Sequence, residues 1–211
     1  MNPANIPPLK LKHRFKTIDT PKQRALVSIF IAILLGGFAW VLLVYRPFFA
    51  EDQVVQLAII GLLFGLSLLL IYSAIYQILA TRIPTTILES SQDILERGKT
   101  VNFYCRQAGP INLISLRINL LGEEVWWTID KNDKEKTRNT RHIGTYNFFD
   151  SGALQISANK PYEADISFTL PQNIPATGKT KEQRLVVWKI EIWGKVQGYV
   201  NFYHSYPVQV R

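Results

Sequence analysis

The chain has 211 residues, a formal net charge of +8 and a hydrophobic content of 47%. Its single cysteine, Cys105, excludes an internal disulfide and a cysteine-based metal site. Residues 1–24 carry a net charge of +5 and residues 82–211 only +4, so the chain lacks the basic stripe that is typical of a nucleic-acid-binding protein.

Residues 1–24 form a basic tail. The first eight residues are rich in proline and lack periodicity, so we expect this tail to be partly disordered. The cations that follow, interleaved with apolar residues, have two interpretations. They contact anionic lipid headgroups, or they act only as a topology signal for the next helix. The candidate headgroup contacts are Lys10, Lys12, Arg14 and Lys16.

Two long apolar runs follow, at residues 25–45 and 54–80, and neither contains an acidic or basic residue. About 20 apolar residues suffice for a helix to cross the hydrocarbon core of a bilayer. We therefore predict a transmembrane hairpin over residues 25–81. A cleaved signal peptide is the alternative for the first run, but that run is too long and no small-residue cleavage site follows it.

The distribution of charge predicts the orientation of the hairpin. Six basic residues precede the first run, whereas the connecting loop has one, Arg46. By the positive-inside rule the N-terminus and the domain after the hairpin are cytoplasmic, in the inner or plasma membrane. Because neither span contains a charged residue, we expect an anchor rather than a proton relay, an ion pathway or a transport site.

The second run contains Gly61 and Gly65, which match the close-packing motif of membrane helices. We consider a packing role for these glycines, most simply between the two spans, beside the alternative that this common motif has no role.

Residues 82–211 have the period-two alternation of β-strands and no helical segment. A turn-rich connection is expected at residues 92–99, and residues 131–141 are expected to form a solvated loop or a hairpin tip. In residues 185–193 the pattern places Trp188 inward and Trp193 outward, and another alternating segment, residues 114–120, places Ile114 inward. We predict an all-β domain that folds as an antiparallel β-sandwich. Its expected strands lie at residues 83–88, 100–105, 114–120, 125–129, 146–149, 154–157, 162–170, 185–193, 199–203 and 208–210.

Residues that could carry chemistry are sparse. The histidines His13, His142 and His204 are far apart in the sequence. The paired acids Glu123–Glu124 and Glu163/Asp165 are explained by solvated strand or turn positions rather than by acid–base catalysis. We therefore expect no catalytic residue, no metal site, no cofactor, no small-molecule substrate and no enzymatic activity.

The order of short motifs in residues 100–211 resembles one half of an arrestin-type sandwich. The motifs are Gly98–Thr100, Trp126–Trp127, Leu170–Pro171, Ile174–Gly178, Val187–Ile192 and Pro207–Val208. The sequence is also similar to bacterial membrane proteins of the DUF3592-like group, which join such a sandwich to a transmembrane hairpin. The resemblance implies an immunoglobulin- or arrestin-like fold and a role in protein binding. Arrestins have two such lobes and this chain has one, so no binding residue is transferred.

We interpret the chain as a membrane-anchored, non-enzymatic protein-binding or scaffold module. The lipid bilayer and an unidentified protein are its expected partners. Outward aromatic residues at Trp193, Tyr199 and Tyr203 are the candidate partner surface. The alternative for these residues is that a loop, the membrane surface or the other sheet covers them. The alternative for the whole chain is an accessory subunit of a larger membrane complex, with the hairpin as its interface.

Overall fold

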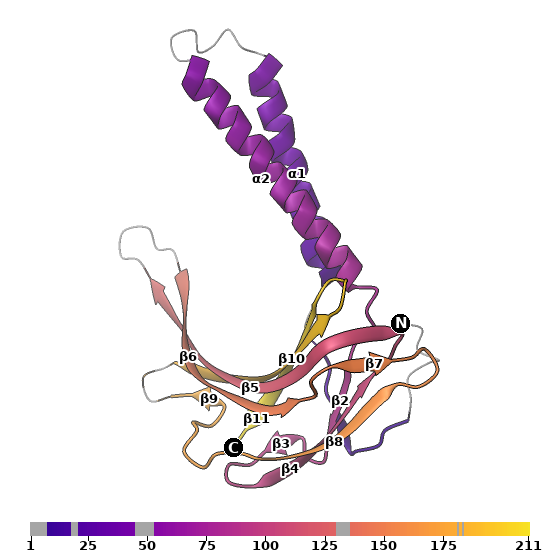
Figure 1. The fold of residues 1–211 in the computed structure, drawn as a ribbon. Helices are drawn as coiled ribbons and strands as arrows, with labels where there is room; N and C mark the ends of the chain where they lie inside the picture. Colours follow the sequence, from indigo (N-terminus) through magenta and orange to yellow (C-terminus); the bar gives the residue numbers. More distant parts are fainter. Residues whose placement is uncertain (1–7, 18–20, 45–52, 130–135, 181, 183) are drawn as a thin grey trace. The chain divides into compact units, whose positions relative to one another are not determined.

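The computed structural model describes residues 8–17, 21–44, 53–129, 136–180, 182 and 184–211. The chain divides into two compact units (Figure 1). One is Thr20–Ile83, and the other joins Met1–Asp19 to Pro84–Arg211. The expected boundaries differ at the N-terminus, because residues from the basic tail form part of the β unit instead of a separate segment.

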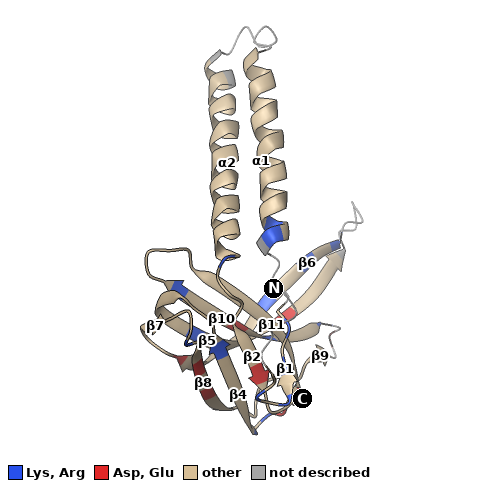
Figure 2. Cartoon of the chain, turned by 90° about the vertical axis from the view of Figure 1, so that its right-hand side faces the viewer, with Lys and Arg blue, Asp and Glu red and all other residues tan. Residues whose placement is uncertain are grey.

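The first unit contains two helices, α1 (Pro21–Val44) and α2 (Gln53–Ala80), which cover the two predicted spans apart from residue 45, which lies outside the described residues. Both are long and apolar enough to cross a membrane. Among their residues the charged ones are Lys22 and Arg24, both at the start of α1 (Figure 2). The expected apolar helices are therefore confirmed, and their length and composition suit a bilayer.

The two helices pack along a seam of mostly small residues. The buried residues recur every seven positions on each helix, which is the spacing of a coiled-coil seam. Across the seam the Ser67 hydroxyl donates a hydrogen bond to the Ala32 carbonyl oxygen at 2.9 Å. Small side chains here let the two backbones approach closely. The seam residues are Ala25, Ala32 and Ala39 on α1 and Ile60, Ser67 and Ala74 on α2.

The second unit is a β-sandwich, and its smaller sheet has the strand order β1-β2-β4-β8. Its strands are β1 (His13–Arg14), β2 (Ile87–Ser90), β4 (Thr100–Gln107) and β8 (Tyr162–Thr169). Strand β1 comes from the N-terminal tail and pairs antiparallel with β2, where Arg14 lies opposite Glu89. Strands β4 and β8 pair in full register from Thr100 opposite Thr169 to Gln107 opposite Tyr162.

The larger sheet has the strand order β3-β11-β10-β5-β6. Strand β7 pairs with β5, and β9 pairs with β10. Strands β3 and β11 are parallel, an exception to the antiparallel pairing that we expected. The strands are β3 (Ile94–Leu95), β5 (Ile111–Ile129), β6 (Lys136–Asp150), β7 (Leu154–Ile156), β9 (Gly178–Lys179), β10 (Leu185–Val196) and β11 (Phe202–Val210).

Strand β6 begins earlier than the sequence pattern indicated. We expected a solvated loop or a hairpin tip at residues 131–141, of which 131–135 lie outside the described residues. Residues 136–141 belong to a long hairpin and pair with β5, from Lys136 opposite Ile129 to Arg141 opposite Glu124, so the strand extends further than expected. This part of the strand is solvated on both faces, so it lacks the apolar alternation that reveals a half-buried strand.

The core between the two sheets is aromatic and aliphatic. Phe148 of β6 contacts Phe103 of β4 and Phe168 of β8, with ring centroids 5.2 and 4.9 Å apart. Trp188 is 1% exposed, and its indole N–H donates to the Pro175 carbonyl oxygen at 2.9 Å. The predicted inward orientation of Trp188 is therefore confirmed.

One expected core residue, Ile114, is 45% exposed. In the pairing of β5 with β10, Ser115 lies opposite Lys195 and Leu113 lies opposite Val196, so Ile114 is the extra residue of a β-bulge. The bulge changes the alternation, and Leu113 takes the buried position instead.

Candidate functional site

The outward face of the β10–β11 hairpin carries the aromatic residues that the sequence singled out. Trp193 and Tyr203 are paired across the two strands, and their ring centroids lie 4.5 Å apart. Trp193 is 49% exposed, whereas Tyr203 is half-buried. The structure therefore brings two of the three predicted residues into direct contact on the solvent side of the sheet.

The third predicted residue, Tyr199, lies outside the strand in which we placed it. Strand β11 begins at Phe202, so Tyr199 belongs to the turn between β10 and β11. It is 42% exposed. The expected strand from residue 199 is thus too long, because the chain is still turning at Gly198, which has a φ of 65°.

A carboxylate holds the aromatic pair in place. Glu191 accepts a hydrogen bond from the Tyr203 hydroxyl at 2.6 Å and one from the Trp193 indole N–H at 3.2 Å. The Lys189 ammonium lies 3.1 Å from Glu191 and 3.2 Å from Glu123. The sequence indicates only that Lys189, Glu191 and Trp193 lie on the same outward face of their strand. It does not predict the contacts among them.

The ionisation of this cluster follows from its contacts. Burial, together with the hydrogen bond to Glu191, raises the pKa of Tyr203 to about 12. Burial acts to lower the pKa of Lys189, but its contacts with Glu191, Tyr203 and Glu123 outweigh that effect and raise it. At neutral pH the Tyr203 phenol is therefore protonated and Lys189 carries its positive charge, and the hydrogen bonds to Glu191 hold Trp193 and Tyr203 in a fixed orientation.

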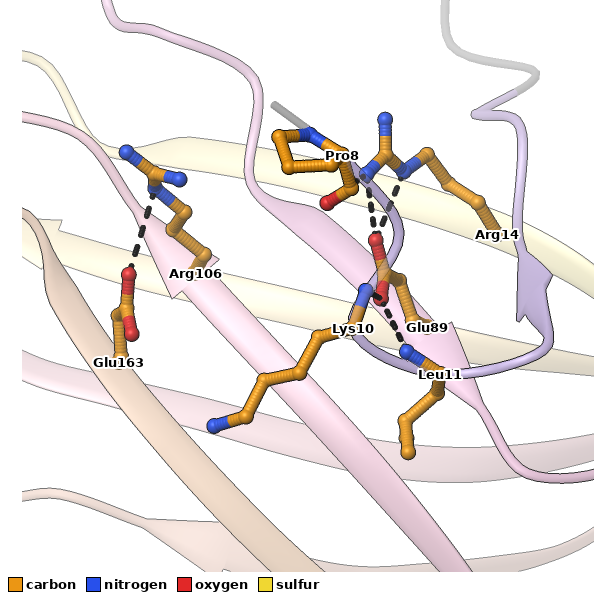
Figure 3. A network of polar contacts seen from close by, with 7 residues as sticks. All are labelled: Pro8, Lys10, Leu11, Arg14, Glu89, Arg106 and Glu163. Atoms are coloured by element: carbon orange, nitrogen blue, oxygen red, sulfur yellow. Dashed lines mark hydrogen bonds and ion pairs between the residues drawn. The ribbon is translucent and has the colours of Figure 1, made fainter. Parts of the chain in front are cut away.

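A second polar site, which the sequence did not indicate, lies where the edge strand β1 pairs with β2 (Figure 3). The Glu89 side chain is fully buried and accepts hydrogen bonds from the backbone N–H groups of Lys10 and Leu11, each at 2.8 Å. Its other oxygen accepts from the Arg14 guanidinium at 2.9 and 2.5 Å. We call residues 8–17, which lie on this edge, the strap.

The strap contacts the acidic outer face of the smaller sheet at a second point. The Lys10 ammonium lies 2.9 Å from the carboxylate of Asp165 and 4.4 Å from the centre of the Tyr104 ring. Burial acts to raise the pKa of Glu89, but the donors from Leu11, Arg14 and Lys10 outweigh it and hold this pKa below its ordinary value. Glu89 is thus an ionised carboxylate in a buried position, satisfied by the strap.

These contacts bear on the four candidate headgroup residues. Lys10 and Arg14 are engaged with Asp165 and Glu89, which is a use that the sequence interpretation did not include. The side chains of Lys12 and Lys16 are exposed.

The two glycines proposed for helix packing are not in the seam between α1 and α2. Gly61 and Gly65 are exposed, and a Cβ atom at either position would meet nothing within 4 Å. The close approach occurs at Gly36 instead, where a Cβ atom would lie 3.2 Å from the Ser67 hydroxyl oxygen. The expected packing of the two spans through Gly61 and Gly65 is therefore corrected.

Two side chains that could carry chemistry, Cys105 and His204, are largely buried. Burial raises the pKa of the Cys105 thiol to about 12 and lowers the pKa of His204 to about 4. His142 lies on the exposed strand β6. Among the described residues, no three His, Cys, Asp or Glu side chains gather in a way that could hold a metal ion.

No protein-family model matches the sequence, and no curated protein matches it. Among solved structures, the chain is similar to the crystal structure of Spo0M, a sporulation control protein from Bacillus subtilis, at 19% sequence identity and a TM-score of 0.44. The similarity covers 60% of this chain and 49% of that chain, so it spans about half the length of Spo0M. A likeness at this TM-score assigns neither a family nor a function.

Proposed function

We propose that the chain is a membrane-anchored, non-enzymatic module that binds another protein through its cytoplasmic β-sandwich. The observation that carries this proposal is the combination of two apolar helices with a sandwich that presents a fixed aromatic pair to solvent. Trp193 and Tyr203 have the amphipathic character of residues that dominate protein interfaces. Anchoring at the membrane would raise the local concentration of this aromatic pair near membrane-associated partners, so that weak contacts suffice for binding.

The surface of the helices supports the anchoring. Large apolar side chains such as Phe30, Leu34 and Phe38 on α1, and Leu62 and Leu69 on α2, are more than half exposed. This much apolar surface is not left in water, and a hydrocarbon environment covers it on all sides at once.

The strap supports an even number of membrane crossings. Residues 10–15 are hydrogen-bonded to residues 88–90 within one compact unit, so these two segments lie on one side of any membrane. The two helices lie between them in the sequence. Two crossings satisfy this requirement, and the excess of basic residues before α1 favours the cytoplasmic side.

The alternative is an accessory subunit of a larger membrane complex that uses the hairpin as its interface. The exposed Gly61 and Gly65 favour this alternative, because they leave a surface on α2 that another helix could approach closely. The proposal and its alternative therefore place the partner on different parts of the chain.

Affinity purification of the full-length protein in mild detergent separates these two possibilities. We expect serine substitutions at Trp193, Tyr199 and Tyr203 to remove co-purifying proteins, while Trp127→Ser, at another exposed tryptophan, retains them. If the partners persist although the sandwich stays folded, the binding site lies elsewhere. If Gly61→Leu with Gly65→Leu removes them instead, the accessory-subunit alternative is correct.

A further inference from the structure

The buried carboxylate of Glu89 is bound by residues 10–14 of the same chain. Its four donors all come from the strap, from residues 75 to 79 positions earlier in the sequence. One oxygen accepts two successive backbone N–H groups, and the other accepts the fork of an arginine, which is the strong geometry for a carboxylate.

The strap is held to the sheet by polar contacts, and its side chains bury little surface. None of its described residues is buried, and Leu9 is 57% exposed. Its regular pairing with β2 is limited to His13 and Arg14, with one further hydrogen bond from Phe15 N–H to the Leu88 carbonyl oxygen at 3.0 Å. Segments with few buried apolar contacts open at lower free energy than the core of a domain.

Release of the strap would leave a specific vacancy on the sheet. Glu89 would keep its position on β2 but would lose the two backbone N–H donors and the arginine fork, which are charge-assisted hydrogen bonds and therefore strong ones. The vacated edge would also expose the backbone groups of β2, to which another strand can add. A replacement ligand must therefore supply the same groups as the strap.

The surrounding charge selects a basic ligand. Acidic residues lie on β2 and on β8 (Figure 2), and Lys10 reaches Asp165 across the Tyr104 ring. The spacing in the strap defines what fits: two consecutive backbone N–H groups at Lys10 and Leu11, then an arginine three residues later.

We propose that the β2 edge with Glu89 is a binding site for an extended basic segment of a partner protein, and that the strap occupies it until the partner segment replaces it. This inference rests on the proposed protein-binding function and names the class of ligand. The partner segment adds as a strand beside β2, and its arginine binds Glu89 as Arg14 does.

The test uses the full-length protein in detergent and a fluorescent synthetic peptide with the sequence of residues 8–17. In the wild type the strap competes at high effective concentration. Arg14→Ala weakens the strap and leaves Glu89 intact, so we expect this variant to bind the peptide at least tenfold more tightly than the wild type does. Arg14→Lys, which keeps the charge but loses the fork, serves as the second variant if Arg14→Ala does not fold.

The controls separate specific recognition from attraction by charge. Adding Glu89→Gln to Arg14→Ala should weaken peptide binding at least tenfold. Adding Glu163→Gln, a matched change on the same sheet at a residue paired with Arg106, should leave it unchanged. A scrambled peptide should bind at least tenfold more weakly. Equal binding by wild type and Arg14 variants, equal binding of the scrambled peptide, or indifference to Glu89→Gln would each overturn the proposal.

Two further outcomes distinguish this proposal from self-association of the chain and from the proposed function. Concentration-dependent dimers of the wild type that Glu89→Gln abolishes would assign the edge to the strap of a second copy and would overturn a partner of another kind. Specific peptide binding in a protein that co-purifies with no partner would support this site and contradict the proposed function.

Discussion

The indole of Trp188 lies over Gly122, its cross-strand neighbour on β5, so closely that a Cβ atom on Gly122 would come within 2.5 Å of the ring carbon Cη2. The glycine is thus required by the size of the tryptophan. The two residues act as one packing unit in the centre of the larger sheet.

We predict that Gly122→Ala destabilises the sandwich by about 1–3 kcal/mol, because the added methyl group overpacks the core. The ring cannot move away freely, since its N–H is bonded to Pro175 and its face is next to Tyr146. Chemical denaturation followed by tryptophan fluorescence measures the change. An unchanged unfolding midpoint would show that the ring has room to shift.

The second prediction concerns Trp188 itself. Trp188→Ala should lower the free energy of unfolding by about 3–5 kcal/mol, because it removes a fully buried aromatic ring and leaves a cavity. Trp127→Ala, at a tryptophan that is 53% exposed, is the matched control and should change stability little. Equal effects of the two substitutions would contradict the packing described for β10.

The third prediction concerns His204, whose pKa burial lowers to about 4. Its Nδ1 accepts the backbone N–H of Thr86 at 3.4 Å. Because the unfolded state binds the proton more readily, stability is complete above the unfolded pKa of about 6.5 and falls as the pH drops toward 4, by up to about 1.4 kcal/mol per pH unit.

His204→Gln should therefore flatten the dependence of unfolding free energy on pH between about 6.5 and 4. His142→Gln, at an exposed position, should leave the wild-type slope in place. Denaturation curves at several pH values measure both slopes. An equally steep slope in His204→Gln would show that another group causes it.

The fourth prediction concerns the strap. The strap donors keep the pKa of Glu89 below its ordinary value, so the contribution of Glu89 is present above the unfolded pKa of about 4.3 and disappears as the pH falls through the lower folded value. The amide resonances of Lys10 and Leu11 should move together in that acidic range. In Glu89→Gln the common transition should be absent, whereas it should persist in Glu163→Gln.

The fifth prediction concerns orientation. A cysteine at Ala50, between the two apolar helices, should react with a membrane-impermeant thiol reagent added to intact cells, and a cysteine at Ala153 should not. Cys105 is buried and gives little background. Labelling of Ala153→Cys alone would reverse the assigned orientation, and labelling of neither in intact cells but both after lysis would refute a membrane crossing.

The sequence was sufficient to predict the parts of the fold that depend on local periodicity. The apolar runs became α1 and α2, and the alternation around Trp188 and in residues 162–170 became β10 and β8. These patterns are reliable because burial on one face repeats along a single segment.

Features that depend on pairing between distant segments could not be predicted in this way. The position of the strap depends on its hydrogen bonds to Glu89, which is 75 positions from Arg14 in the sequence. The alternation of basic and apolar residues within the strap is equally compatible with a lipid surface. Both helices are apolar on every face, so hydrophobic periodicity cannot indicate which face forms the alanine seam. The prediction therefore relied on the glycine motif, which lies on a different face of α2.

The pairing of β1 with β2 also means that the smaller sheet can form only after both helices have been synthesised. The strap leaves the ribosome first, but its partner strand follows only after both helices have been synthesised. During that interval Lys10 and Arg14 have not yet reached Asp165 and Glu89, so under the proposed membrane anchoring these two cations can contribute to the direction of insertion. The same two residues would thus contribute first to membrane insertion and later to the packing of the strap on the sheet.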